Sequence, residues 1–462
     1  MKPHTFLYTL CLATALACNP PGETVDLAIV HAHILTIDDR WTESPDGTVL
    51  VRGGAIVGLG ASDSLAGTFR ARQTIDARGQ LLLPGLVNTH SHAAMVLLRG
   101  LADDLALQAW LEQHIWPAEG RYMDARAVRL GTRLAWAEMI RGGITTVNDT
   151  YFFVEEVART ASEAGLRAIV AEGLLDFPTP SSPHPDSGLA CTRRMAATWA
   201  GHPRIGVAVS PHSPYTCAPS LLRAAGDLAR ELDLPLHIHL AETATEDTII
   251  YQRYRCSPTR LLDSLGVLGP RTIAAHGVML DAASIATLAQ RGSGVSHNPE
   301  SNMKLASGVA PIPALLAAGV TIGLGTDGAA SNNNLDMFQE MSAAARLQKV
   351  HHHDPHLLDA RQVLYMATRG GAALLGMDDR IGSVETGKQA DFVLIDLGQP
   401  HLQPVHNLYA LAVYSMRASD VRTVVVGGTL LMHDGRLLTL DEQRVVAAAA
   451  AWADSVRQTA RR

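Results

Sequence analysis

Residues 85–104 read GLVNTHSHAAMVLLRGLADD, an apolar run that ends in two histidines spaced two apart. Residues two apart in a β-strand point to the same side, so His90 and His92 can present both imidazoles to one point. Seven more short apolar runs follow and alternate with helical stretches such as residues 125–143 and 220–234. This βα repeat, eight units over roughly three hundred residues, predicts an α/β fold of the (β/α)8 TIM-barrel type.

Polar residues stand where these runs end. The seven later runs read TTVND, RAIVAEGL, RIGVAVSPHS, PLHIHLAET, TIAAHGV, GSGVSHNP and TIGLGTDG. In such barrels the catalytic groups lie at the C-terminal ends of the strands, where loops leave the packed interior. We therefore expect a cluster at the barrel mouth, formed by His90, His92, His212, His239, Glu242, His276, His297 and Asp327. No G-x-G-x-x-G follows an early strand, which disfavours a dinucleotide-binding fold.

Four members of this cluster predict a metal site. A bare H-x-H is weak evidence, because paired histidines in a turn are often simply solvated. A third imidazole from His239 and a carboxylate from Asp327 would complete a four-ligand nitrogen and oxygen site, which is typical of zinc. We therefore assign His90, His92, His239 and Asp327 as metal ligands.

The two ends of the chain have a different texture. Short β-rich runs broken by Gly and Asp occupy residues 25–80 and return in residues 385–445. Such runs indicate strands and hairpins. We expect a small composite β-sandwich domain built from both segments, a barrel over residues 81–384, and a C-terminal helix over residues 446–462.

Size and charge limit the partners. The chain has 462 residues, more than the ~250 to 300 of a usual single core, which suits one large and one small domain. Its formal charge of -7 supplies no broad attraction to nucleic acid, so a small molecule is the expected partner. A homo-oligomer stays open.

The first 18 residues resemble a bacterial lipoprotein signal. Lys2 precedes an apolar segment that ends in ALAC, after which Cys18 would carry the lipid and residues 19–24 would form a tether. This predicts export and attachment to a membrane by that lipid alone; a cytoplasmic protein with an unprocessed N-terminus is the alternative. Cys191, Cys217 and Cys256 show no disulfide or metal spacing, so we expect small buried hydrophobes.

Five ordered motifs resemble the amidohydrolase superfamily, in particular its aminohydrolases that deaminate purine-like rings. They read PGLVNTHSHAAM, HIHLAETATE, AAHGV, SHNPESNMKLASGVAPI and GLGTDGAASNN. The resemblance implies that the four ligands hold one catalytic divalent ion, expected to be zinc, with iron and manganese as alternatives. It also implies that His276 holds the attacking water. Binuclear members need a lysine at the end of strand four, and RIGVAVSPHSPYT has none.

The implied reaction is attack by metal-bound hydroxide, since a divalent ion lowers the pKa of its water to about 7. Asp327 would take the water's proton, and Glu242 would protonate the ring nitrogen before ammonia leaves. Glu242 could instead be a carboxylate at a helix start. We interpret His237 as a satisfied core histidine and residues 351–356, HHHDPH, as a solvated loop, and we leave His297 open between a supporting and a substrate-facing role.

The stretch LALQAWLEQHIWPAEGRYM resembles the substrate loop of methylthioadenosine and S-adenosylhomocysteine deaminases. By that resemblance Trp110 and Glu119 contact the nucleoside, Glu119 binds the ribose hydroxyls, and His212 also binds substrate; an amphipathic loop helix is the alternative. The arginines expected for a homocysteine carboxylate are missing before Arg193 and Arg194. Methylthioadenosine, S-adenosylhomocysteine and adenosine therefore stay open, as do another N-heterocycle such as a pterin, oxidised guanine or triazine, and a non-catalytic nucleoside-binding lipoprotein.

Overall fold

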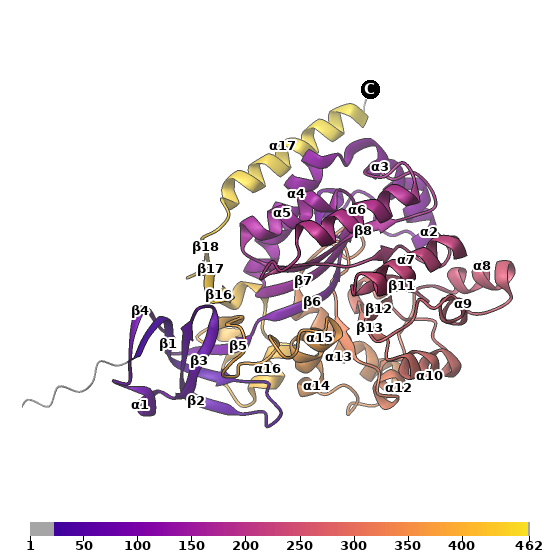
Figure 1. Ribbon diagram of the computed structural model, residues 1–462. Helices are drawn as coiled ribbons and strands as arrows, with labels where there is room; N and C mark the ends of the chain where they lie inside the picture. Colours follow the sequence, from indigo (N-terminus) through magenta and orange to yellow (C-terminus); the bar gives the residue numbers. More distant parts are fainter. Residues whose placement is uncertain (1–22, 461–462) are drawn as a thin grey trace, which may run out of the picture.

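The computed structural model describes residues 23–460, and its larger part is a barrel of parallel strands covered by helices (Figure 1). The barrel strands are buried along their whole length except at Gly206, as parallel strands in barrels are. The barrel strands are β6 Leu86–Ser91, β7 Ile144–Tyr151, β8 Arg167–Leu174, β9 Ile205–Val207 continued by β10 Ser210–Pro211, β11 Leu236–Leu240, β12 Thr272–His276, β13 Gly294–His297 and β14 Ile322–Leu324.

Two parallel arcs make up the barrel. The first runs β10-β8-β7-β6 with β9 on β8, and the second runs β11-β12-β13-β14. A bridge between Val209 and Leu236 joins the arcs on one side. On the other side the amide of Asp327, just after β14, donates to the carbonyl of His90 at 3.0 Å. The predicted (β/α)8 barrel is confirmed, and its closure brings the first and last strand ends together.

Helices follow the strands and cover the barrel on its outside (Figure 1). Several begin at a side chain that accepts backbone N–H groups: Asp124 caps α4 and Thr243 caps α8, where the first N–H groups of a helix have no partner within it. The helices between the strands are α4 Ala125–Arg141, α5 Val154–Ala164, α6 Pro185–Thr198, α7 Pro219–Glu231, α8 Ala244–Tyr254, α9 Pro258–Ser264, α10 Ala282–Arg291, α11 Pro299–Lys304, α12 Ile312–Ala317, α13 Met337–His352, α14 Ala360–Ala367 and α15 Arg369–Leu374.

Between β6 and α4 the chain forms a long excursion over the barrel mouth. It consists of the 3-10 helix η1 Ala93–Leu98, then α2 Leu107–Trp110, the π-helical turn η2 Leu111–Ile115 and α3 Trp116–Tyr122. The stretch predicted to carry substrate contacts is therefore helical. Trp110 and Glu119 lie on it and are both buried.

The two ends of the chain form one nine-stranded sheet. The antiparallel pairing of β5 with β15, which places Leu82 opposite Leu394, joins the N-terminal strands to the C-terminal ones. A separate apolar core, including Ile29, Val49 and Phe392, lies within this domain, as the composite β-sandwich prediction requires. Its strands are β1 Glu23–Leu35, β2 Glu43–Arg52, β3 Ala55–Ala61, β4 Phe69–Asp76, β5 Gln80–Pro84, β15 Phe392–Asp396, β16 Val421–Val426, β17 Thr429–His433 and β18 Arg436–Leu437, with the short helices α1 Ser62–Leu65 and α16 Leu408–Tyr414.

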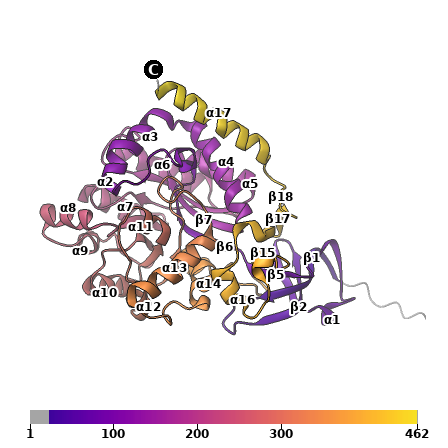
Figure 2. The ribbon, with the colours of Figure 1, turned by 180° about the vertical axis from the view of Figure 1, so that it is seen from behind.

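Two helix ends differ from the sequence-based expectation. The C-terminal helix α17 runs Glu442–Ala460 and lies along α4, so it begins before residue 446 (Figure 2). Asp441 accepts the amide of Arg444 at 3.1 Å and starts the helix there. The prediction that residues 351–356 form a loop is wrong for the first two histidines, because α13 ends at His352. The predicted solvent exposure holds for histidines 351–353.

Two smaller expectations also meet the structure. Cys191 and Cys217 are buried and Cys256 is half-buried, and all three are free thiols. No helix in the described part of the chain is long and apolar enough to cross a bilayer. The signal, Cys18 and most of the tether lie outside the described residues.

A buried ion pair ties the composite domain to the barrel. Arg167 at the start of β8 donates from Nε and Nη2 to the two carboxylate oxygens of Asp391 at 2.9 and 3.0 Å. Asp391 also accepts the amide of Gly427 at 2.7 Å, and Arg167 donates to the carbonyl of Pro203 at 2.9 Å. Both charges are fully buried, so each depends on the other for its solvation.

We predict that Arg167→Met destabilises the protein by roughly 3–5 kcal/mol, because it leaves the Asp391 charge buried and unpaired. Urea unfolding followed by circular dichroism measures this. The double variant Arg167→Met with Asp391→Leu should lose less than the sum of the two single variants, since it removes both charges. Additive losses would show that the pair is not coupled.

Candidate metal centre and substrate cavity

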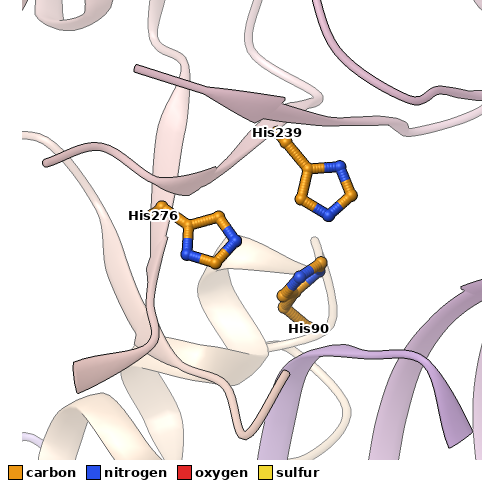
Figure 3. A group of neighbouring side chains, drawn as sticks. All are labelled: His90, His239 and His276. Atoms are coloured by element: carbon orange, nitrogen blue, oxygen red, sulfur yellow. The ribbon is translucent and has the colours of Figure 1, made fainter. Parts of the chain in front are cut away.

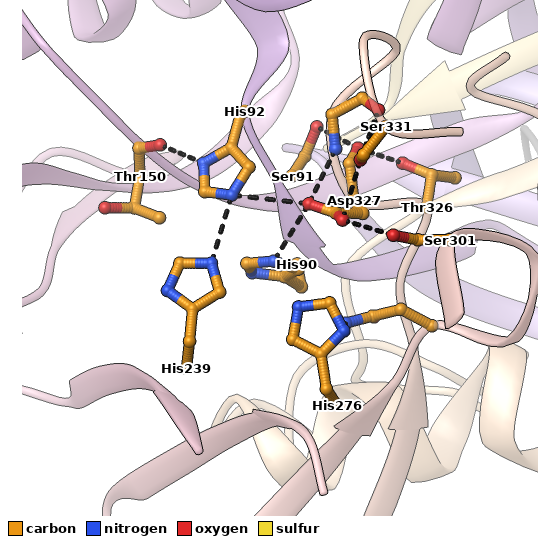
Figure 4. Close-up of polar contacts among 12 residues, drawn as sticks. His90, Ser91, His92, Thr150, His239, His276, Ser301, Thr326, Asp327 and Ser331 are labelled. Carbon is orange, nitrogen blue, oxygen red and sulfur yellow. Dashed lines mark hydrogen bonds and ion pairs between the residues drawn. The ribbon is translucent and has the colours of Figure 1, made fainter. Parts of the chain in front are cut away.

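The structure brings the four sequence-assigned ligands together at the barrel mouth (Figure 4). His90 and His92 come from the end of β6, His239 from β11 and Asp327 from the turn after β14. Oδ1 of Asp327 lies 3.2 Å from Nε2 of His90 and 3.3 Å from Nε2 of His92. Nε2 of His92 lies 3.2 Å from Nε2 of His239. Ligand atoms from three distant strands thus converge on one point.

Backbone carbonyls fix the tautomers of two of these rings. Nδ1 of His92 donates to the carbonyl of Thr150 at 2.6 Å, and Nδ1 of His239 donates to the carbonyl of His212 at 2.7 Å. A carbonyl can only accept, so each Nδ1 carries a proton, and Nε2 is the atom that each ring offers to a metal. Two Nε2 atoms 3.2 Å apart must either share a proton or face a cation together. Nδ1-anchored rings of this kind are characteristic of metal ligands.

His90 is held by a fourth histidine. Its Nδ1 lies 2.9 Å from Nε2 of His237, and burial lowers the pKa of His90 to about 4, so the ring is neutral. Nε2 of His90 is buried and faces Oδ1 of Asp327 at 3.2 Å, as one ligand atom beside another would. The interpretation of His237 as a satisfied core histidine is wrong: it contacts a ligand, and its own Nδ1 is buried without a partner.

Asp327 is held ionised by its surroundings. Ser301 and Ser331 donate to Oδ2 at 2.7 and 2.8 Å, and the amide of Gly328 donates to Oδ1 at 2.8 Å. Burial alone would raise the pKa of Asp327, but the hydrogen bond with His90 and the electrostatic effect of the neighbouring histidine rings outweigh it and keep the pKa well below its usual range. The backbone is also strained, with φ of 58° at Asp327 and 75° at His276. Strain of this kind concentrates at functional sites.

His276 and Glu242 complete the reaction centre. The rings of His90, His239 and His276 face one another across a small gap (Figure 3), and their ligand atoms lie within 4.8 Å of one another. Nδ1 of His276 pairs with Oδ1 of Asn302 at 2.9 Å, while its Nε2 lies 3.9 Å from Oε2 of Glu242. Glu242 is buried, and burial raises its pKa. Both groups are placed to handle protons beside the metal ligands.

A second carboxylate holds the loop that carries Glu242. Glu246 is fully buried, and its two oxygens accept the amides of Ala241 and Glu242, each at 3.0 Å. Sequence reasoning missed Glu246. The signal was the TATE sequence at residues 243–246, a Thr-x-x-Glu helix start in which the glutamate turns back onto preceding amides.

The cavity above the ligands is partly open to solvent, and the space within it, open solvent included, amounts to about 740 Å³. Trp110, Glu119 and His212, the three predicted substrate contacts, all line it together with Glu242. The indole Nε1 of Trp110 is buried without a partner, so it is free to donate to a bound molecule. His212 pairs through Nδ1 with Thr216 Oγ1 at 2.9 Å, and burial lowers its pKa to about 3, so it is neutral.

Glu119 has a partner that sequence reasoning did not find. The hydroxyl of Tyr151, at the end of β7, donates to Oε1 of Glu119 at 2.7 Å. Burial raises the pKa of Glu119 to about 7, and the Tyr151 hydrogen bond partly opposes that rise. No local pattern marks Tyr151, because the contact joins the end of strand β7 to helix α3, which are separate parts of the chain.

Three other residues lie away from the cavity. His297 is fully buried, does not line the cavity, and has no partner at either ring nitrogen, so a substrate-facing role is excluded in this structure. Arg193 and Arg194 are exposed on α6, where they pair with Glu231 and Glu155 respectively. Neither arginine lines the cavity.

Histidines and an ionised carboxylate at a barrel mouth, beside a buried acid and a cavity, are the arrangement of a metal-dependent hydrolase. The chain belongs to the amidohydrolase family, whose family model matches residues 81–431. As a member related to deaminases, it hydrolyses carbon–nitrogen bonds other than peptide bonds.

Relatives with curated names extend over nearly the whole chain. The chain is 46% identical over 437 residues to 5-methylthioadenosine/S-adenosylhomocysteine deaminase 1 of Syntrophus aciditrophicus. This match covers 95% of this chain and 99% of the relative. It is 48% identical over 421 residues to the 5-methylthioadenosine/S-adenosylhomocysteine deaminase of Syntrophobacter fumaroxidans, with 91% and 96% covered.

Solved structures agree with these relatives. An adenosine deaminase from Xanthomonas campestris with bound zinc superposes with a TM-score of 0.93 at 41% identity, over 95% of this chain and all of that one. An atrazine chlorohydrolase from Arthrobacter aurescens complexed with zinc superposes with a TM-score of 0.86 at 26% identity, over 92% of this chain and 100% of that one.

We predict that chelation lowers the thermal unfolding midpoint of the wild-type protein, because an ion that binds only the folded state stabilises it, by about 4 kcal/mol at a thousandfold excess over Kd. Differential scanning calorimetry with and without a chelator measures this. His239→Ala should bind less than one ion per chain and unfold at a midpoint that the chelator does not change. A chelator effect of the same size in both proteins would contradict the ligand assignment.

Proposed function

We propose that this enzyme deaminates adenosine-type nucleosides to the corresponding inosine derivatives and ammonia. The observation that carries the proposal is the position of Glu119: a buried carboxylate shares one cavity with Glu242 and the metal ligands. A carboxylate is suited to accept the two vicinal hydroxyls of a ribose, and the site is left with an unpaired buried group when the ribose is missing. The names of the relatives support the same substrate class.

The chain's own residues divide the proton transfers. Zinc, which suits three imidazoles and one carboxylate, would be held by His90, His92, His239 and Asp327, and when bound it makes its water acidic near neutral pH. Asp327, ionised and next to these rings, accepts the proton of the water. His276 orients the water through Nε2, since Asn302 fixes its Nδ1.

Glu242 supplies the opposite transfer. Because burial raises its pKa, the protonated form is available to donate to the ring nitrogen that gains charge under attack. Two carboxylates with opposite pKa shifts in one site are the usual sign of a base and an acid. Trp110 and His212 line the rest of the cavity, where the nucleoside must lie.

We also propose that the protein is exported and anchored by lipid on Cys18, with the nucleoside as its small-molecule partner. The signal-like sequence of residues 1–18 supports this. Mass spectrometry of the N-terminus of protein isolated from cell membranes tests it, and an unmodified chain that begins at residue 1 in the cytoplasmic fraction would argue for the alternative.

We predict that Glu242→Gln lowers kcat for adenosine deamination by a factor of about 10² to 10⁴, the usual contribution of a general acid. The amount of bound metal should stay near one ion per chain. Ammonia release and elemental analysis measure the two quantities. Glu231→Gln serves as a matched control, because Glu231 is exposed at the end of α7 and does not line the cavity. Unchanged turnover in Glu242→Gln would remove the acid role.

A second prediction concerns ribose. Glu119→Ala should reduce kcat/KM for adenosine by far more than kcat/KM for free adenine, because only the nucleoside uses the carboxylate. Tyr151→Phe should give a smaller loss in the same direction, since it removes the donor that orients Glu119. Equal losses for nucleoside and base in Glu119→Ala would refute ribose recognition and favour another N-heterocycle as substrate.

A further inference from the structure

The charged side chains that line the cavity are all acidic. Among the described residues around it, Glu119, Glu242 and Asp327 carry carboxylates, and no lysine or arginine is present. Much of the remaining wall is apolar and includes Leu111, Leu175 and Leu305. Whatever pose a ligand takes inside, it meets no cationic side chain.

The cations near the cavity are engaged elsewhere. The ammonium of Lys304 donates to Asp103 and Asn333, each at 2.6 Å. Arg253 is exposed on α8 and touches the cavity only through the carbonyl of Tyr215, to which it donates at 3.2 Å. A solvated guanidinium in such a position contributes little to an ion pair.

We propose that this site selects adenosine-type nucleosides with an uncharged 5′ substituent and discriminates against 5′ substituents that carry a carboxylate. The inference rests on the proposed function and narrows its substrate class. A carboxylate that enters the cavity loses its hydration, and among the described residues that line the cavity it finds no lysine or arginine to compensate. An apolar 5′ substituent such as methylthio instead gains from contact with the leucine wall.

The test compares three nucleosides on the metal-replete wild-type enzyme. 5′-Methylthioadenosine is small and neutral, and 5′-butylthioadenosine has a longer neutral chain. S-adenosylhomocysteine has a chain of similar length that carries a carboxylate and an ammonium, so discrimination against it must exceed any attraction of that ammonium to the acidic wall. We expect kcat/KM for the two neutral compounds to agree within about fivefold and to exceed that for S-adenosylhomocysteine by at least about tenfold. Calorimetric binding to Glu242→Gln should follow the same order without turnover.

Each other outcome has a defined meaning. Equal kcat/KM for S-adenosylhomocysteine and 5′-methylthioadenosine overturns the proposal, and so does an equal loss for both long chains, which would show a limit on length. If Arg253→Ala lowers kcat/KM for S-adenosylhomocysteine alone, the guanidinium does serve the carboxylate and the proposal is wrong. If no nucleoside is deaminated but Glu242→Gln binds them in the expected order, the proposed function fails and the selectivity stands. Absence of binding by all three overturns both.

Discussion

The metal centre depends on one close contact: Nε2 of His92 and Nε2 of His239 are held 3.2 Å apart. Each ring is anchored through Nδ1 to a carbonyl of a neighbouring strand end, so neither can turn away. The arrangement is unfavourable in an apolar interior unless a cation is present. The closure of the barrel, which joins Asp327 to His90, supplies the negative charge that balances such a cation.

The pKa values of the carboxyl groups in this cavity differ because their neighbours differ. Asp327 is surrounded by hydrogen-bond donors and histidines and stays ionised, whereas Glu242 and Glu119 have fewer donors and their pKa values rise with burial. The carboxyl group therefore suits all three roles that we propose: a base, an acid and a ribose acceptor. All three carboxyl groups are buried at the mouth of one barrel, so the difference between their pKa shifts arises from the groups that each one contacts.

The composite domain contributes to this site at a distance. It pairs the two ends of the chain in one sheet and is bound to the barrel through the buried Arg167 and Asp391. Arg167 begins β8, one of the strands whose far end borders the cavity at Gly173 and Leu175. The ion pair thus holds a wall of the substrate cavity from the opposite end of a strand.

Local patterns in the amino-acid sequence were sufficient for the barrel, the divided β domain and the four ligand positions. Strand periodicity and the strand-end rule depend only on nearby residues, and the H-x-H spacing at His90 and His92 is itself local. Helix ends were less determined: α17 begins at the Asp441 cap and α13 extends through His352, because capping and packing set such boundaries. Tertiary structure alone decided that Tyr151 holds Glu119 and that His237 supports His90. It also decided that no lysine or arginine of the described residues lines the cavity. These contacts join residues that are far apart in the chain. The sequence around either partner does not indicate which other side chain will lie against it.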